Sequence, residues 1–206
     1  MFELSEMQHD ALVEVFNIGV GRAAASMSSM VNEEISLSVP SINFLNLQDA
    51  ATILEGQGRE NKKVCGVTQH FEGAFNTDVV LMFPEDKSLE LVRIMVGESI
   101  PLEQLTEMEQ EAMSEIGNIL LNSCMGTMAD ILGTEMNGSL PVYQVGSTEE
   151  ILGVSDKGNE SFVLILRIDF ILEKLKINGH VAFVMDADAM KDTCRHIDQY
   201  LFAFTG

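Results

Sequence analysis

The sequence predicts an α+β fold in which two similar halves share one mixed or antiparallel sheet, flanked by helices and related by a pseudo-two-fold axis. Two observations predict it. A stretch near the N-terminus recurs about one hundred residues later with the same spacing. In each half a helical hydrophobic period then gives way to strand-like runs and a final helix. Each half therefore supplies a helix, a strand, a hairpin and a second helix.

The internal repeat is the strongest of these signals. Residues 4–18 align with residues 105–119 at a constant offset of 101, with identical Leu, Glu, Met, Ala, Glu, Asn and Ile and conservative exchanges between them. The same offset carries Pro40 onto Pro141. We therefore expect a single domain made of two repeats, about residues 1–98 and 102–206, joined near residues 97–101.

Each repeat opens with a predicted helix. The capping-box spacing, in which a hydroxyl and a longer polar side chain satisfy backbone donors, occurs as Ser5 with Gln8 and as Thr106 with Glu109. Apolar residues then recur at helical spacing to about Val31 and Leu132. Gly19 and Gly21 lower the helix propensity of the first helix, and we expect them to let another backbone approach closely.

Strand-like runs follow each helix. The expected strands are 35–39 before Pro40, 64–71 and 74–83 as a hairpin around Gly73, and 162–172 and 177–185 as a hairpin around Asn178-Gly179. Final helices are expected at 86–95 and 187–201, and the polar stretches 56–63 and 146–161 are interpreted as loops.

Composition excludes several classes of function. Twelve basic residues against 32 acidic ones give a net charge of −20, which argues against binding to nucleic acid or to an anionic membrane. The charge is interpreted first as an aid to solubility and second as steering toward a basic partner. No apolar run reaches the roughly 20 residues of a membrane helix, and the N-terminus lacks a signal-peptide pattern, so a cytoplasmic protein is expected. The three cysteines are far apart, which favours reduced thiols, and Cys124 is expected in the core.

A polar stripe accompanies the apolar one on each repeated helix. The stripes are Asp10, Glu14 and Asn17 in the first repeat and Glu111, Glu115 and Asn118 in the second. Spacings of three and four residues place each set on one helix face. One such set is ordinarily interpreted as a solvent-exposed helix face. Shared ancestry of the two repeats can also preserve residues that have no function. Repetition of the Glu and Asn in register, beside positions that have drifted, favours function.

These residues resemble the signature of the CheC, CheX and FliY phosphatases, and the two-repeat form is nearest to CheC. The pattern is Asp or Ser, three residues, Glu, two residues, Asn, twenty-two residues and Pro, seen as Asp10, Glu14, Asn17 and Pro40 and again as Glu111, Glu115, Asn118 and Pro141. The resemblance covers essentially the whole chain. Two departures are Glu111 in place of Asp or Ser and Phe16 in place of the glycine before the first Asn. Both are expected to alter how closely a partner docks.

The resemblance implies a chemotaxis phosphatase that hydrolyses the aspartyl phosphate of a CheY-type response regulator. The implied roles are water positioning for Asn17 and Asn118, contact with the regulator's lysine for Glu14 and Glu115, docking for Asp10 and Glu111, and turn geometry behind each helix for Pro40 and Pro141. No cofactor or metal of its own is expected, and Mg²⁺ belongs to the receiver domain of the substrate. A CheD-type receptor deamidase is a second implied partner.

Two other classes of function remain open from the sequence. The first is a catalytically silent adaptor that binds a phosphorylated regulator or a receptor deamidase, and retention of both Glu–Asn pairs weighs against it. The second is a self-sufficient metal hydrolase, which is disfavoured because no ligand set is evident. The scattered histidines that share no motif are His9, His70, His180 and His196.

Overall fold

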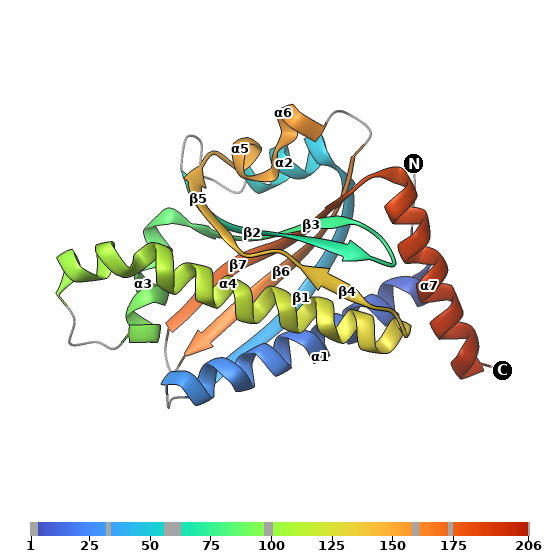
Figure 1. The fold of residues 1–206 in the computed structure, drawn as a ribbon, viewed down its shortest axis with the longest axis horizontal. Coiled ribbons are helices and arrows are strands. Elements are labelled where there is room, and N and C mark those ends of the chain that lie inside the picture. The colour runs from blue at the N-terminus through green and yellow to red at the C-terminus, as the bar shows by residue number, and fades with distance from the viewer. Residues whose placement is uncertain are drawn as a thin grey trace.

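The computed structural model describes residues 4–31, 34–55, 63–96, 101–157, 161–172 and 175–205. Within them, one seven-stranded sheet is flanked by helices on both faces, as Figure 1 shows. The strand order is β1-β6-β7-β3-β2-β4, with β5 also paired to β2, and every pairing is antiparallel. The predicted α+β class with a single shared sheet is confirmed.

The two halves share one order of elements, except that the second half has two short strands and two short helices where the first has one strand and one helix. The first half contains α1 (Glu6–Val31), β1 (Ile35–Asn46), α2 (Leu47–Glu55), β2 (Val64–Gly73), β3 (Thr77–Pro84) and α3 (Glu85–Val96). The second contains α4 (Leu102–Leu132), β4 (Met136–Gly138), β5 (Val142–Gly146), α5 (Thr148–Leu152), α6 (Val154–Lys157), β6 (Phe162–Leu172), β7 (Leu175–Met185) and α7 (Ala187–Thr205). At the offset of 101, the single strand β1 corresponds to the broken pair β4 and β5.

The two long helices α1 and α4 cover one face of the sheet. They run antiparallel and side by side, with α3 near one end and α7 at the other (Figure 1). The larger core lies between these helices and the sheet and includes Phe16, Leu81 and Phe183. The opposite face carries α2, α5 and α6 over a smaller core that includes Met82 and Val163. None of the described helices is both long and apolar enough to cross a membrane.

Local capping explains where several elements begin. The predicted capping box at the start of α1 is confirmed, because Gln8 N donates to Ser5 Oγ at 3.2 Å and Ser5 N donates to Gln8 Oε1 at 2.9 Å. The one predicted at Thr106 is wrong. The helix α4 already begins at Leu102, directly after Pro101, whose ring fixes φ at a value suited to a helix start. Thr106 therefore lies inside the helix.

The stretch 146–161, interpreted as a loop, contains two short helices. Ser147 and Glu150 form a capping box, with Glu150 N to Ser147 Oγ at 3.2 Å and Ser147 N to Glu150 Oε2 at 2.8 Å. Gly153, in the left-handed region with φ of 68°, ends α5. The helix α2 was also not predicted, and most of the other expected loop, residues 56–62, lies outside the described residues.

Three strand boundaries differ from the prediction. Asn178-Gly179 does not form a hairpin turn, since both residues pair with β6 inside β7. The second strand of the first hairpin begins at Thr77 rather than at residue 74. Strand β1 continues through Pro40 to Asn46, because β1 is an edge strand and can tolerate a missing backbone donor.

At Gly19 the backbones of α1 and α4 approach each other closely. A Cβ built at Gly19 would lie 2.9 Å from Cys124 Cα and 3.3 Å from Ser123 O, whereas one built at Gly21 would meet nothing within 4 Å. The predicted close approach is therefore confirmed for Gly19 and wrong for Gly21.

We expect Gly19→Ala to lower the free energy of unfolding by about 1 kcal/mol, since crowding between backbones outweighs the gain in helix propensity. Gly21→Ala, the matched control on the same helix, should raise it by about 0.5–1 kcal/mol. Urea denaturation of the two variants checks this. If both substitutions changed the free energy of unfolding in the same direction, the close contact between α1 and α4 at Gly19 would be contradicted.

The three cysteines are free and buried. Burial raises the pKa of Cys65 to about 12, and the nearby charge of Glu109 contributes to this shift. Burial also raises the pKa of Cys124 to about 12 and that of Cys194 to about 11. The ordinary value is 9.0. The expected burial of Cys124 is confirmed.

We expect all three thiols to resist a thiol-specific reagent in the folded protein at pH 8 and to react after denaturation. Unfolded thiols lose their protons first, so these groups should lower stability progressively as pH rises from about 9 to about 12. Thiol titration with and without denaturant tests this. Rapid reaction of any thiol in the folded protein would refute its burial.

Candidate functional site

The two polar stripes lie on the same face of the molecule but beside opposite edges of the sheet. The carboxylates of each stripe are exposed, and each asparagine is half-buried where its helix meets the edge of the sheet. The first site faces the edge strand β1, and the second faces β2 and the β4–β5 edge. Helix α1 thus carries Asp10, Glu14 and Asn17, and helix α4 carries Glu111, Glu115 and Asn118.

In the first site, Asn17 is bonded directly to the edge strand. Val39 N donates to Asn17 Oδ1 at 3.2 Å, immediately before Pro40. The pairing of β1 with β6 shifts register between Ser38 and Ser41, so Pro40 occupies an irregularity in the strand. The structure therefore places Pro40 within β1, and the spacing from Asn17 to Pro40 reflects a helix-to-strand hydrogen bond.

In the second site, the asparagine is held by side chains instead of a backbone amide. Asn118 Oδ1 accepts from Asn122 Nδ2 at 2.8 Å and from Gln69 Nε2 at 3.3 Å. Gln69 Nε2 also donates to Ser139 O at 2.8 Å, two residues before Pro141. Pro141 lies in the break between β4 and β5. Both asparagines are therefore fixed through Oδ1, by a backbone amide in one site and by two side-chain amides in the other.

The residue before each asparagine sets how the helix sits on the sheet. A Cβ at Gly117 would lie 2.7 Å from Val67 Cβ, so α4 packs closely against β2. Phe16, the corresponding residue of α1, is completely buried, with its ring centroid 5.0 Å from that of Phe183. Phe16 is therefore part of the packing between α1 and the sheet and is not exposed to a partner.

A hollow of about 630 Å³ opens at the second site. It is lined by Glu111, Ala112, Ser114, Glu115, Asn118 and Pro141, together with the apolar side chains Met30, Met95, Met108 and Leu140. Leu140 is 86% exposed, whereas its counterpart at the offset of 101, Val39, is 5% exposed. The second site thus combines acidic groups, one amide and adaptable methionines, a combination suited to a protein partner.

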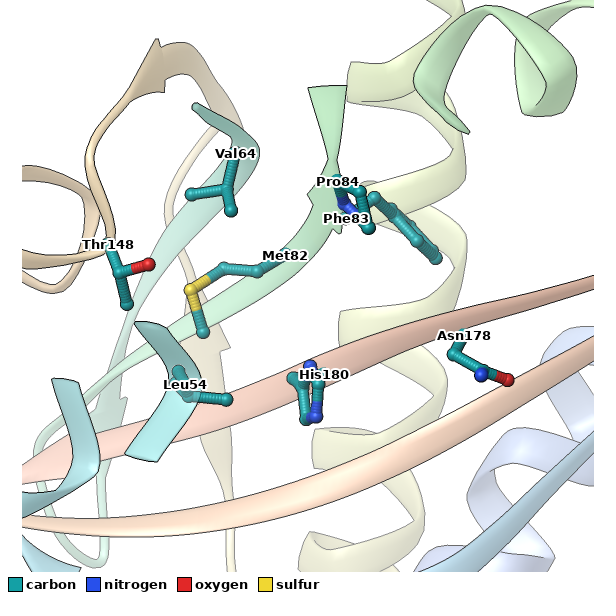
Figure 2. A pocket seen from close by; sticks show the side chains of 8 residues that line it. All are labelled: Leu54, Val64, Met82, Phe83, Pro84, Thr148, Asn178 and His180. Carbon is teal, nitrogen blue, oxygen red and sulfur yellow. The ribbon is translucent and has the colours of Figure 1, made fainter. Parts of the chain in front are cut away.

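A smaller hollow, of about 270 Å³, lies on the opposite face of the sheet. Figure 2 shows Leu54, Met82 and His180 around it, with Thr148 close by. Because Met82 belongs to the core beneath α2 and α5, this hollow is separated by the sheet from both asparagines.

The arrangement suits positioning and charge complementarity. Among the residues described, no three His, Cys, Asp or Glu side chains come together as a group of metal ligands. Within the same residues, no hydrogen-bond acceptor is found for Nδ2 of Asn17 or Asn118, so the two N–H groups of each amide remain available as donors. Asn17 Oδ1 receives one bond and keeps capacity for a second, whereas Asn118 Oδ1 already receives two.

Sequence reasoning found the stripes but missed their supports. Gln69, Asn122 and Ser139 were not singled out, and neither was the amide of Val39. One signal was present, because every second residue of β2 faces the larger core and Gln69 is the polar member of that set. The inward-facing residues are Cys65, Val67, Gln69 and Phe71.

Known proteins resemble the chain in both sequence and fold, although no family model matches it. It is 24% identical over 196 residues to the CheY-P phosphatase CheC of Bacillus subtilis, covering 91% of this chain and 92% of that protein. The crystal structure of Thermotoga maritima FliY aligns with a TM-score of 0.76 at 18% identity, covering 97% of this chain and all of the other.

A further structural neighbour is CheX from Borrelia burgdorferi, solved in a complex with CheY, BeF3 and Mg²⁺. It aligns with a TM-score of 0.52 at 17% identity, covering 85% of this chain and 98% of the other. These likenesses cover most of the chain. The chain is therefore similar in sequence to CheC and FliY and similar in fold to FliY and CheX.

Proposed function

We propose that this chain is a chemotaxis protein phosphatase that hydrolyses the aspartyl phosphate of a CheY-type response regulator. The observation that carries the proposal is the pair of Glu–Asn sets, each on a long surface helix with its asparagine tied to the edge of the sheet. We further propose that the two repeats form one cytoplasmic domain with two separate sites.

The comparisons support this class of partner. The similar CheC is named a CheY-P phosphatase, and the similar CheX was solved with CheY. An exposed carboxylate next to a half-buried amide also suits a substrate that brings its own cation and lysine. In such a reaction, phosphoryl transfer depends mainly on placing the nucleophile and stabilising charge.

In the proposed reaction, Asn17 or Asn118 orients a water in line with the phosphorus. The water oxygen forms a bond to phosphorus while the bond from phosphorus to the aspartate oxygen breaks. The carboxylate leaves with the electron pair, and the water's protons pass to phosphate and solvent. An outward Nδ2 can donate to one lone pair of the water and leave the other directed at phosphorus. A neutral amide serves better than a carboxylate, which would repel the phosphoryl oxygens.

The glutamates are proposed to hold the regulator in register. Glu14 and Glu115 each lie three residues before an asparagine, about one helical turn away on the same face. Each exposed carboxylate can therefore contact the regulator's lysine while the asparagine contacts the water. Asp10 and Glu111, another turn back, are proposed as docking residues.

The proposal is tested by following phosphate on a phosphorylated CheY-type receiver domain with and without this protein. We expect faster loss of phosphate. We also expect a Mg²⁺ requirement that is explained by metal binding to the receiver alone. The absence of any acceleration with cognate receivers, or a metal requirement traced to this chain's own side chains, would refute the proposed mechanism.

A further inference from the structure

Gln69 is a buried amide from the first repeat that reaches into the site of the second. Its residue exposure is 1%, and it lies on β2 among apolar neighbours. Its Nε2 donates to Asn118 Oδ1 at 3.3 Å and to Ser139 O at 2.8 Å, and its Oε1 accepts from Asn122 Nδ2 at 3.4 Å. A buried amide that is hydrogen-bonded at both ends holds its neighbours in one arrangement.

In the first site, the position that matches Gln69 carries an apolar residue. Strand β2 corresponds to β6, because both strands pair in the same register with the strand that follows the long helix of a repeat. Thr68 pairs with Val142, and Arg167 pairs with Ser41, the counterpart of Val142 at the offset of 101. Likewise, Phe71 pairs with Gly138, and Phe170 pairs with Leu37, the counterpart of Gly138. In that register, Gln69 corresponds to Ile168, which is fully buried and apolar. Asn17 is held instead by the amide of Val39.

That alternative support does not exist in the second site. Leu140, the counterpart of Val39, lies outside β4 and β5 and turns its side chain into solvent. The orientation of Asn118 therefore depends on side-chain donors, of which Gln69 is the buried one and Asn122 is exposed.

We propose that Gln69 is a positioning residue for Asn118, so that the first repeat contributes to the chemistry of the second site. This inference rests on the proposed phosphatase function and adds to it. By donating to Asn118 Oδ1 from beneath, Gln69 turns Asn118 Nδ2 outward toward the phosphoryl group and its attacking water. Loss of this donor leaves the Asn118 amide held only by the exposed Asn122.

Ser139 should keep its place when Gln69 is changed. Ser139 N donates to His70 O at 2.8 Å, and His70 N donates to Ser139 Oγ at 3.0 Å. These two bonds fix the segment between β4 and β5 independently of Gln69. A substitution of Gln69 therefore tests the orientation of Asn118 more than the position of this segment.

The experiment uses the full chain with the first site silenced by Asn17→Ala. In that background, Gln69→Ile, which introduces the residue type of Ile168, should lower kcat for a phosphorylated receiver domain on the order of tenfold. KM should change less than about twofold, because docking groups are untouched. Gln69→Leu serves as a second variant of similar volume should the branched side chain disturb folding.

The matched control is Gln69→Ile in the Asn118→Ala background, where only the first site remains. There the substitution should leave kcat unchanged, which a general loss of structure would not do. Equal losses in both backgrounds, or unchanged kcat in the Asn17→Ala background, would overturn the positioning role. An inactive Asn17→Ala variant would also overturn it, because the second site would then have no activity for Gln69 to support. Failure of the unsubstituted protein to accelerate dephosphorylation would instead refute the proposed function itself.

Discussion

Replacing both Asn17 and Asn118 by alanine is expected to abolish catalysis while leaving the fold and most of the affinity for the regulator intact. The asparagines are half-buried and are held by hydrogen bonds through Oδ1. In the proposed mechanism their Nδ2 donors place the attacking water on the way to the transition state. Removing a group that acts only in the transition state lowers kcat rather than affinity.

The expected loss is on the order of 10²-fold at each altered site, comparable to losing one well-placed positioning group. If both sites work independently, each single variant retains about half the activity and the double variant almost none. Rates with each single variant and the double variant, measured beside binding of the phosphorylated receiver, check this. A double variant with turnover close to that of the unsubstituted protein would show that the asparagines do not act in the reaction.

Replacing Glu14 and Glu115 by alanine is expected to weaken capture of the phosphorylated regulator. Each carboxylate is exposed and one turn from its asparagine, where it can form a charge-assisted contact with the regulator's lysine. Such a contact is typically worth about 1.5–3 kcal/mol, roughly a ten- to hundredfold change in affinity.

The matched control for this change is an exposed glutamate on the opposite face. Glu55 is the last residue of α2, and α2 lies on the face of the sheet opposite α1 and α4 (Figure 1). In a chain with a net charge of −20, removing one such carboxylate should alter affinity little. Affinity is measured at several salt concentrations for Glu14→Ala, Glu115→Ala and Glu55→Ala. Equal behaviour of all three variants would leave the stripe glutamates only a general charge effect.

Periodicity predicted the elements that depend on it. The long helices end at Val31 and Leu132 as expected, because apolar residues at helical spacing bury one face against the sheet. The helices in the stretch 146–161 were missed because they are too short to show a period, and the boundaries of α5 come from a capping box and a left-handed glycine. Asn178-Gly179 is a strong local turn signal, but the residues before and after it also pair with β6, so the strand continues through it.

The candidate site was predictable only where one helix carries it. Residues three and four apart on a helix share a face, so the Glu–Asn sets follow from the sequence alone. Gln69 precedes Asn118 by 49 residues in the sequence. Ser139 follows Asn118 and lies beyond the end of α4. Their contact with Asn118 depends on the strand order that places β2 beside β4 and β5. The spacing between Asn17 and Pro40 was visible, but its hydrogen-bond cause required β1 to be placed against α1.

The most direct test of the central claim is the amount of phosphate released per molecule of this chain from a large molar excess of phosphorylated receiver domain. A catalyst with positioning residues should release many phosphates per chain, at a rate that falls nearly to the receiver's own when Asn17 and Asn118 are both replaced. A silent adaptor would bind the receiver without changing its rate of phosphate loss. Release no faster than that of the receiver alone, with binding intact, would contradict the assignment of this chain as a phosphatase.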